Sequence, residues 1–311
     1  MTFDEPLRPV DGLVFDLDGT LILSDRSLGG YRLLPGAVET LAALQARGVP
    51  FLAFTNGSAY RPSDQAAKLR RLGLPIDDSR MVTPSSVAAD LMVRAGVKKA
   101  LVLGTPGVGH ALEDVGIVVR FAGDADAETA DAVYIGWHPE CGMKDIEAAA
   151  NAIWNGARLY VASDVPFFAT SAGKTLGYSH AIAAAVRKLT RAPMILTGKP
   201  SLQALRFAAR RLGVSARRLA VVGDDPLVEI IMARRGGAIG LGVTTGTTSA
   251  EEWAAQPGNR RPHRVLERLI DLLELGIVEE APARAKSSSQ RKLGSHWSSH
   301  AAQGREGQGR S

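Results

Sequence analysis

Asp16 and Asp18 are the residues whose type and spacing point most directly to chemistry, in the segment VFDLDGT. The apolar run before them is typical of a strand buried on both faces. Because Asp16 and Asp18 are two residues apart on a strand, both side chains point to the same face of the sheet. Ligands bind at the carboxyl ends of parallel strands, so both carboxylates would face a ligand. Adjacent carboxylates repel each other, and a divalent cation relieves that repulsion. The alternative is a simple turn, in which Asp and Gly are common.

Three further polar groups follow apolar runs in the same way. They are Thr55, Asn56 and Gly57 after FLAF, Lys199 in LTGKP, and Asp224 with Asp225 in LAVVGDD. The first group offers a hydroxyl and backbone N–H groups to phosphate oxygens, and the lysine would offset charge on a transferring phosphoryl group. The adjacent acids suit a hard cation such as Mg²⁺. Each alone could be a turn, a surface lysine or a loop, but their shared position favours a single site.

The elements that carry these groups alternate between strands and helices. Apolar runs predict strands within 12–20, 49–57, 216–225 and 238–246, and helical spacing predicts helices within 35–48 and 63–73. This alternation indicates an α/β fold with a parallel, Rossmann-like sheet and helices on both faces. The apolar spacing in 263–275 predicts a last helix that packs on this domain.

Residues 98–193 are predicted to form a second α/β unit inserted into the first. The core would then comprise 1–97 and 194–280, and 281–311, rich in Ser, Gly, Gln and Arg, is predicted to be a disordered basic tail. The segment GTPGVG (104–109) lacks the Gly-Lys-Ser/Thr ending of a nucleotide loop and the dinucleotide spacing. We predict a tight turn there.

Composition limits the classes of function. Of 37 Lys and Arg and 32 Asp and Glu, six cations and one acid lie between Arg284 and Ser311, so the remaining 31 basic and 31 acidic residues balance. A neutral body argues against nucleic-acid binding. No apolar stretch approaches the roughly 20 residues of a membrane span. A single cysteine and an N-terminus without an apolar signal core predict a cytoplasmic protein.

Together the four groups resemble the motifs of the haloacid dehalogenase superfamily of phosphohydrolases. Their order, TNGS after the second strand, LTGKPS and GVTTGTT (242–248) resemble its class IIA, which includes nucleotidase and 4-nitrophenylphosphatase-like proteins. The resemblance covers about 10–278. It implies a Rossmann-like core with an inserted α/β cap of the larger (C2) type, which closes over a small phosphorylated metabolite, and a homodimer formed through the cap.

The resemblance implies a mechanism that the strand-end groups also favour. Asp16 would attack phosphorus and form an aspartyl phosphate, while Asp18 would protonate the leaving oxygen and then activate water. Thr55 and Lys199 would bind the phosphoryl oxygens. Mg²⁺ would be held by Asp16, Asp224 and the backbone carbonyl of Asp18.

Several positions depart from the subfamily pattern. Val228 and Glu229 stand where a Thr-Asp pair is usual, and we expect Glu229 to reach a metal-bound water, with weaker activity. In the cap, Ser163–Pro166 replaces a usual Asn-x-Asp segment. His138, in Trp137–Glu140, is a candidate substrate-binding residue, equally interpretable as part of a surface turn. Cys141 is interpreted as a small, partly buried residue and not as a nucleophile.

Other functions remain open at this point. A catalytically silent binding protein would be consistent with Val228 and Glu229, and phosphoryl transfer to an acceptor would use the same residues as hydrolysis. Dehalogenation is disfavoured because Asp18 and Asp224 would have no role. The sequence leaves the phosphomonoester open among nucleotides, sugar phosphates, glycerol phosphate and pyridoxal phosphate.

Overall fold

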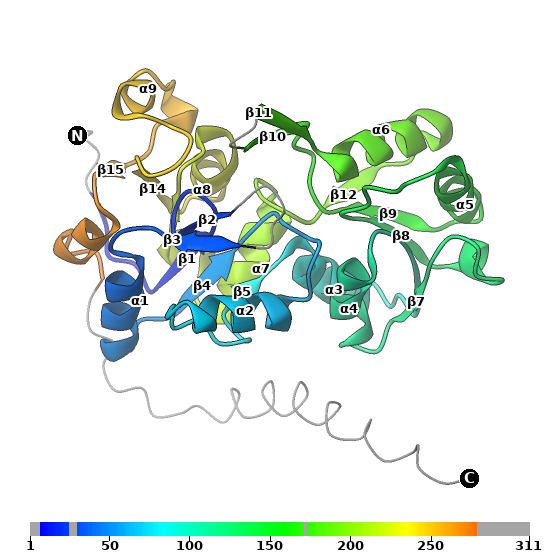
Figure 1. Ribbon diagram of the computed structural model, residues 1–311, viewed down its shortest axis with the longest axis horizontal. Coiled ribbons are helices and arrows are strands. Elements are labelled where there is room, and N and C mark those ends of the chain that lie inside the picture. The colour runs from blue at the N-terminus through cyan, green and yellow to red at the C-terminus, as the bar shows by residue number, and fades with distance from the viewer. Residues whose placement is uncertain (1–6, 25–29, 171–172, 279–311) are drawn as a thin grey trace, which may run out of the picture.

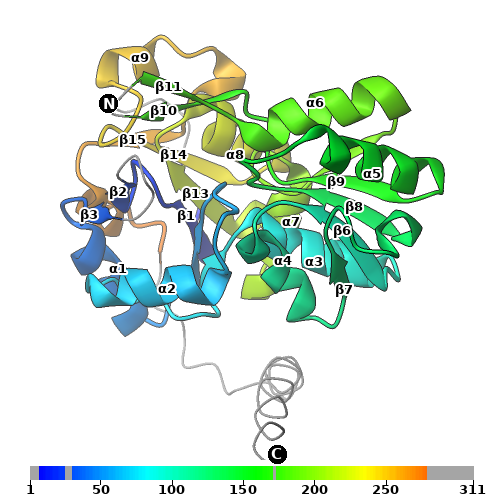
Figure 2. The same ribbon diagram turned by 45° about the vertical axis from the view of Figure 1, so that its right-hand side comes forward.

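Two parallel sheets organise the chain (Figures 1 and 2). The computed structural model describes residues 7–24, 30–170 and 173–278. The first sheet has six strands in the order β15-β14-β13-β1-β4-β5, and all of its pairings are parallel. Its strands are β1 (Gly12–Asp16), β4 (Phe51–Phe54), β5 (Met81–Val82), β13 (Leu219–Gly223), β14 (Ile239–Val243) and β15 (Arg264–Leu266). The predicted α/β class with a parallel sheet is confirmed.

Helices cover both faces of this sheet because its central strands are apolar on both sides. Leu13 and Phe15 of β1 pack in one buried cluster, whereas Val14 packs in another on the opposite face. The covering helices are α1 (Ala37–Ala46), α2 (Pro62–Arg71) and η5 (Leu269–Glu274) on the first face, and α3 (Pro84–Arg94), α7 (Leu202–Leu212) and α8 (Ile231–Gly236) on the second. The short strands β2 (Ile22–Ser24) and β3 (Tyr31–Leu33) form a separate antiparallel pair, and α9 spans Ala250–Ala254.

The second sheet has five parallel strands in the order β12-β9-β8-β6-β7. They are β6 (Lys99–Leu103), β7 (Val118–Arg120), β8 (Ala132–Ile135), β9 (Arg158–Val161) and β12 (Met194–Leu196). Helices α5 (Met143–Trp154) and α6 (Tyr178–Thr190) pack on one face, and α3 and α4 (Pro106–Glu113) on the other. The strands β10 (Phe167–Thr170) and β11 (Gly173–Leu176) pair separately and antiparallel.

Three details differ from the sequence expectations. The strand β12 belongs to the second sheet, so we propose that the inserted unit spans 98–196 and does not end at 193. The segment 263–275 is not one helix, because Val265 lies in the edge strand β15, which pairs with β14, and a 3₁₀ helix follows. The segment 104–109 starts helix α4 at Pro106 instead of forming a tight turn.

Two further predictions concern the C-terminal tail and the lack of a membrane-spanning segment. The tail 281–311 lies outside the described residues. Among the helices that the structure describes, none combines the length and apolar character that crossing a bilayer requires.

Candidate active site

Asp16 is the last residue of β1, between β4 and β13 in the first sheet. The residue is 8% exposed, and its Oδ1 contacts the ammonium group of Lys199, which is 1% exposed. Thr20 Oγ1 donates to the other carboxylate oxygen, Asp16 Oδ2, at 3.5 Å. The two residues of this buried ion pair are 183 positions apart in sequence, so the fold joins two of the predicted groups at the carboxyl end of β1.

Asn56 fixes the backbone that carries this lysine. Its Oδ1 accepts a hydrogen bond from the Lys199 N–H at 2.8 Å, and its Nδ2 donates to the Lys199 carbonyl at 2.9 Å. Both ends of the Asn56 amide are therefore engaged by the neighbouring loop. The sequence analysis assigned Asn56 to substrate binding, and the structure places its side chain where it positions Lys199.

Carboxylates outnumber cations in this site. The gathered acids are Asp16, Asp18, Asp224, Asp225 and Glu229, and Lys199 is the one cation that the described contacts place against them. Burial would lower the pKa of Lys199, but Asp16 and Glu229 outweigh it and the pKa is raised. A divalent cation would offset the excess negative charge, and an all-oxygen donor set fits Mg²⁺.

Asp224 is held by the segment that follows β14. Its Oδ2 accepts a hydrogen bond from the Thr247 N–H at 2.7 Å, and a side chain at Gly19 or Gly246 would overlap its carboxylate. Thr245 Oγ1 donates to the Gly19 carbonyl at 2.7 Å and joins the two loops. Burial raises the pKa of Asp224 to about 7, and the charge of Asp16 adds to the effect. A backbone packed this closely presents the carboxylate in one orientation, as a metal ligand requires.

Asp18 stands at the mouth of the site. The residue is exposed to solvent, yet protein surrounds it on most sides, and this partial desolvation raises its pKa. Hydrogen bonding to Ser24, whose N–H lies 3.0 Å from Oδ1, opposes the rise, and the Asp16 charge adds to it. A carboxyl group with a raised pKa and access to solvent is suited to donate and accept protons.

Glu229 forms a buried ion pair with Lys199. Its Oε1 accepts from Lys199 Nζ at 2.6 Å, and its Oε2 accepts from the Asp225 N–H at 3.3 Å. In this structure protein groups contact both oxygens, and the expected contact of Glu229 with a metal-bound water stays a prediction. The side chain is 2% exposed, and burial raises its pKa well above the ordinary value, opposed by Lys199.

The loop after β4 connects the two sheets. Thr55 is 5% exposed, and its Oγ1 accepts from the Gly57 N–H at 3.0 Å. The adjacent Ser58 Oγ accepts from the Trp137 N–H at 3.0 Å, and Trp137 follows β8 of the second sheet. The carboxyl ends of both sheets therefore meet beside the candidate phosphate-binding loop. The ring of Trp137 packs edge-on against Tyr178, 4.7 Å between centroids.

His138 lies within the inserted unit. Its Nε2 lies 3.4 Å from Asp145 Oδ1, and within the described part of the chain no hydrogen bond joins His138 to the carboxylates of the core. Cys141 lies nearby, half-buried, and burial together with Asp145 raises the pKa of its thiol to about 11. A thiol with that pKa is protonated at neutral pH, which agrees with the interpretation that it is not a nucleophile.

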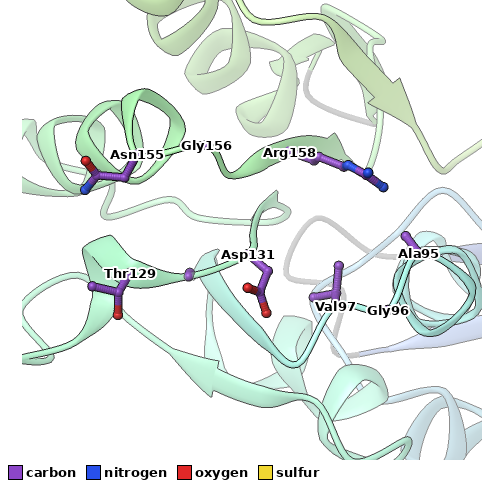
Figure 3. A pocket seen from close by; sticks show the side chains of 9 residues that line it. Ala95, Gly96, Val97, Thr129, Asp131, Asn155, Gly156 and Arg158 are labelled. Carbon is purple, nitrogen blue, oxygen red and sulfur yellow. The ribbon is translucent and has the colours of Figure 1, made fainter.

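A pocket of about 450 Å³ lies elsewhere (Figure 3). Asp131, Asn155 and Arg158 line it at the amino ends of β8 and β9, whereas Trp137 approaches the core from the carboxyl end of β8. The Asp131 carboxylate accepts hydrogen bonds from the backbone N–H groups of Lys98 and Lys99, which lower its pKa. This acid has a structural role, and the pocket is not the carboxylate site.

Sequence reasoning missed the residues that hold the Asp224 carboxylate and the Gly19 loop in place. Thr245, Gly246 and Thr247 were noted only as part of a run that resembles the family. A Thr- and Gly-rich run directly after a buried strand is the signal that could have identified them, because such runs supply backbone N–H groups at the sheet edge.

Known proteins are similar to this chain in sequence and in fold. A family described as haloacid dehalogenase-like hydrolase matches residues 13–118, and one described as HAD-hydrolase-like matches 196–272. The 5′-nucleotidase YutF of Bacillus subtilis is 27% identical over 79% of this chain and 91% of its own length. The dihydroxyacetone phosphatase of Corynebacterium glutamicum is 27% identical over 83% of this chain and 89% of its own.

A solved phosphatase structure is also similar to this chain. The glycerol phosphate phosphatase of Mycobacterium tuberculosis, crystallised in complex with calcium, is 29% identical with a TM-score of 0.71, over 85% of this chain and 74% of its own. The two matched segments together span more than half of the chain and contain every core carboxylate described above. With its inserted α/β unit, the chain belongs to the haloacid dehalogenase-like hydrolases of class IIA.

Proposed function

We propose that the protein hydrolyses small phosphomonoesters through an aspartyl phosphate on Asp16. The observation that carries the proposal is the environment of the Asp16 carboxylate. It stands at the carboxyl end of a central strand, paired with buried Lys199 and close enough to Asp224 to raise the pKa of that acid. Phosphoryl transfer depends mainly on positioned charge, and this arrangement supplies a nucleophile, a cation and a metal ligand together.

The chain's own residues account for the steps. The Asp16 carboxylate attacks phosphorus while Asp18 gives its proton to the leaving oxygen, which departs as an alcohol. Asp18, now ionised, takes a proton from the water that attacks the phosphorus of the aspartyl phosphate, and inorganic phosphate leaves. Lys199 and the Thr55–Gly57 loop hold the phosphoryl oxygens throughout. Asn56 keeps the lysine in place through its two backbone hydrogen bonds.

Proteins of this family generally use Mg²⁺. Here we propose that Asp16, Asp224 and the carbonyl of Asp18 hold it. When bound, Mg²⁺ would supply positive charge that offsets the charge developing on the transferring phosphoryl group. The excess of carboxylates over cations in this site supports the assignment.

The substrate class is proposed from the relatives and the contact between the two sheets. The relatives named above are phosphatases of a nucleotide, dihydroxyacetone phosphate and glycerol phosphate by their names. Trp137 lies against the phosphate-binding loop, so we propose that the inserted unit covers the leaving group and excludes bulk water.

Phosphate release from a panel of nucleotides, sugar phosphates, glycerol phosphate, dihydroxyacetone phosphate and pyridoxal phosphate tests the proposal. The assay is run with Mg²⁺ and with EDTA, on the wild type and Asp16→Asn. We expect metal-dependent release that Asp16→Asn lowers at least ~1000-fold. The matched control Asp78→Asn, an exposed carboxylate paired with Arg70, should keep wild-type activity.

Three outcomes contradict the proposal in different ways. Turnover by Asp16→Asn would remove the nucleophile assignment. Release of the alcohol without inorganic phosphate, in the presence of an acceptor alcohol, would indicate phosphoryl transfer. A folded, Mg²⁺-bound wild type that is inactive on the whole panel would indicate a silent binding protein.

We also propose a homodimer formed through the inserted unit. Met143, Trp154 and Leu189 of α5 and α6 are 76%, 63% and 55% exposed, large values for apolar side chains. Met143 and Trp154 are eleven residues apart and therefore on the same side of α5. Light scattering after chromatography should report a dimer that Trp154→Glu dissociates and that Val93→Glu, on α3, does not. A wild-type monomer would contradict the proposed dimer.

The cytoplasmic location and the absence of nucleic-acid binding stay predictions.

A further inference from the structure

Three side chains of metal-binding types converge in the loop between β8 and α5. The donor atoms of His138, Cys141 and Asp145 all lie within 4.8 Å of one another. Each of the three residues is half-buried. Within residues 7–24, 30–170 and 173–278, this is the one group of three or more His, Cys, Asp or Glu side chains that approach so closely.

The local backbone brings these side chains together. The Cys141 N–H donates to the His138 carbonyl at 3.3 Å and closes a turn that places the imidazole and the thiol near each other. Helix α5 begins directly after this turn, and the Gly142 N–H donates to Asp145 Oδ2 at 2.8 Å. One Asp145 oxygen therefore caps the helix, and the other, Oδ1, faces His138 Nε2 at 3.4 Å.

The spacing fits a tetrahedral ion. Zinc bonds of about 2.0–2.3 Å place neighbouring donor atoms about 3.3–3.8 Å apart. The His138–Asp145 separation of 3.4 Å already has this value. No separation in the group exceeds 4.8 Å, so a side-chain movement of at most about 1 Å would bring all three donor atoms to tetrahedral spacing. We propose that His138, Cys141 and Asp145 form a second metal site, in the inserted unit, that binds Zn²⁺ or a similar transition metal.

The donor chemistry separates this site from the core site. Imidazole nitrogen and thiolate sulfur favour Zn²⁺ and its neighbours over Mg²⁺, whereas the core offers oxygen alone. Binding would release the thiol proton, since the thiolate is the ligand. Three protein ligands leave one position of a tetrahedron for water or another small ligand.

The position of the site indicates what the ion would do. His138 directly follows Trp137, whose N–H donates to Ser58 beside the phosphate-binding loop. An ion that ties His138 to the start of α5 would hold this loop in one conformation against the core. The role is one of positioning, and the site takes no part in the phosphoryl-transfer chemistry.

Cobalt binding provides a specific test. The full-length protein, stripped of metal by a chelator and kept reduced, is titrated with Co²⁺ in the presence of excess Mg²⁺, followed by displacement with Zn²⁺. Thiolate coordination to Co²⁺ gives a charge-transfer band in the near ultraviolet that oxygen and nitrogen ligands do not give. The chain has one cysteine, so the band reports Cys141 alone. We expect one equivalent of Co²⁺ per chain with this band, lost on adding Zn²⁺.

Substitutions of the three residues test which side chains bind the metal ion. Cys141→Ser should abolish the band, and His138→Ala and Asp145→Asn should each weaken Co²⁺ binding by more than the ~10- to 100-fold typical of an outer-shell partner. Asparagine still caps α5, so a change in Asp145→Asn is not a folding effect. The matched controls are His180→Ala and Asp164→Asn, from a His–Asp pair 2.8 Å apart in the same unit, and they should bind as the wild type does.

Two results would overturn the proposal. One is a wild type that gives no charge-transfer band at a Co²⁺ concentration saturating for ordinary surface histidines. The other is a band whose affinity is unchanged in His138→Ala and Asp145→Asn. Both readouts are independent of phosphatase activity, so neither depends on the proposed function.

Discussion

Lys199 Nζ lies 2.6 Å from Glu229 Oε1, and the two side chains are 1% and 2% exposed. The same ammonium group contacts the nucleophile candidate Asp16, so the lysine is held between two carboxylates. Glu229 reaches it across Gly223, where any side chain would overlap the glutamate methylene groups. Glu229 can therefore take this position only because residue 223 is glycine.

Loss of the Glu229 charge should lower activity without removing the nucleophile. In Glu229→Gln the side-chain length is kept, but Lys199 loses one of the two ionic partners that fix the position of its ammonium group. We expect kcat to fall about 10- to 100-fold, the usual cost of displacing a catalytic group by ~1 Å. Steady-state kinetics on the best substrate measure this, with Glu251→Gln on the exposed face of α9 as control. Wild-type kcat in Glu229→Gln would show that the pair is dispensable.

Gly246→Ala should impair metal binding although it alters no ligand. The added methyl group would overlap the Asp224 carboxylate and force it out of its orientation. We expect the Mg²⁺ concentration for half-maximal activity to rise about 10- to 100-fold, as for a displaced outer-shell partner. Gly258→Ala is the matched control, because a methyl group there meets nothing within 4 Å. An unchanged Mg²⁺ requirement in Gly246→Ala would argue against Asp224 as a ligand.

The role of Asp18 can be separated from that of Asp16 by the leaving group. Asp18→Asn cannot protonate the leaving oxygen, a contribution of typically ~10²–10⁴ in rate. Alkyl phosphates should therefore react slowly at the first turnover. 4-Nitrophenyl phosphate, whose leaving group needs no proton, should still release about one equivalent of nitrophenolate before the aspartyl phosphate stalls. Stopped-flow measurement checks this, and an equal loss of the first turnover with both substrates would contradict the assignment.

The core could be predicted from the sequence because its signals are local. Apolar runs that end in Asp16, Thr55 and Asp224 indicate buried parallel strands, and parallel strands bring their carboxyl ends to one edge. The structure places these residues at that edge. Spacing misled at 263–275, since the positions of Val265 and Leu266 suit a strand as well as a helix. Pairing with β14, which makes β15 the edge strand of the sheet, decided between the two.

Other features depend on contacts between distant segments. Glu229 and Asn56 both contact Lys199, which is 30 and 143 residues away from them in sequence. The local sequence around either residue does not predict this contact. The strand β12 has three half-buried residues, too short a pattern to assign to one sheet or the other. Tertiary contacts therefore decided the details of positioning, whereas the reacting groups could be read from the chain.

The pKa of Asp224 predicts how pH affects Mg²⁺ binding. Burial raises this pKa from 3.8 to about 7 in the metal-free protein, so the folded state holds a proton that the unfolded state has lost between these pH values. That contribution to stability is fully present below pH 3.8 and is lost as pH rises through about 7.

Mg²⁺ must displace the proton from Asp224 to bind. The ion should therefore bind about tenfold more weakly at pH 6 than at pH 8, and the Mg²⁺-induced rise in Tm should be larger at pH 8. Thermal unfolding at both pH values, with and without Mg²⁺, measures this. Asp224→Asn should show no such difference, and a wild-type response to Mg²⁺ that is equal at both pH values would contradict the assignment.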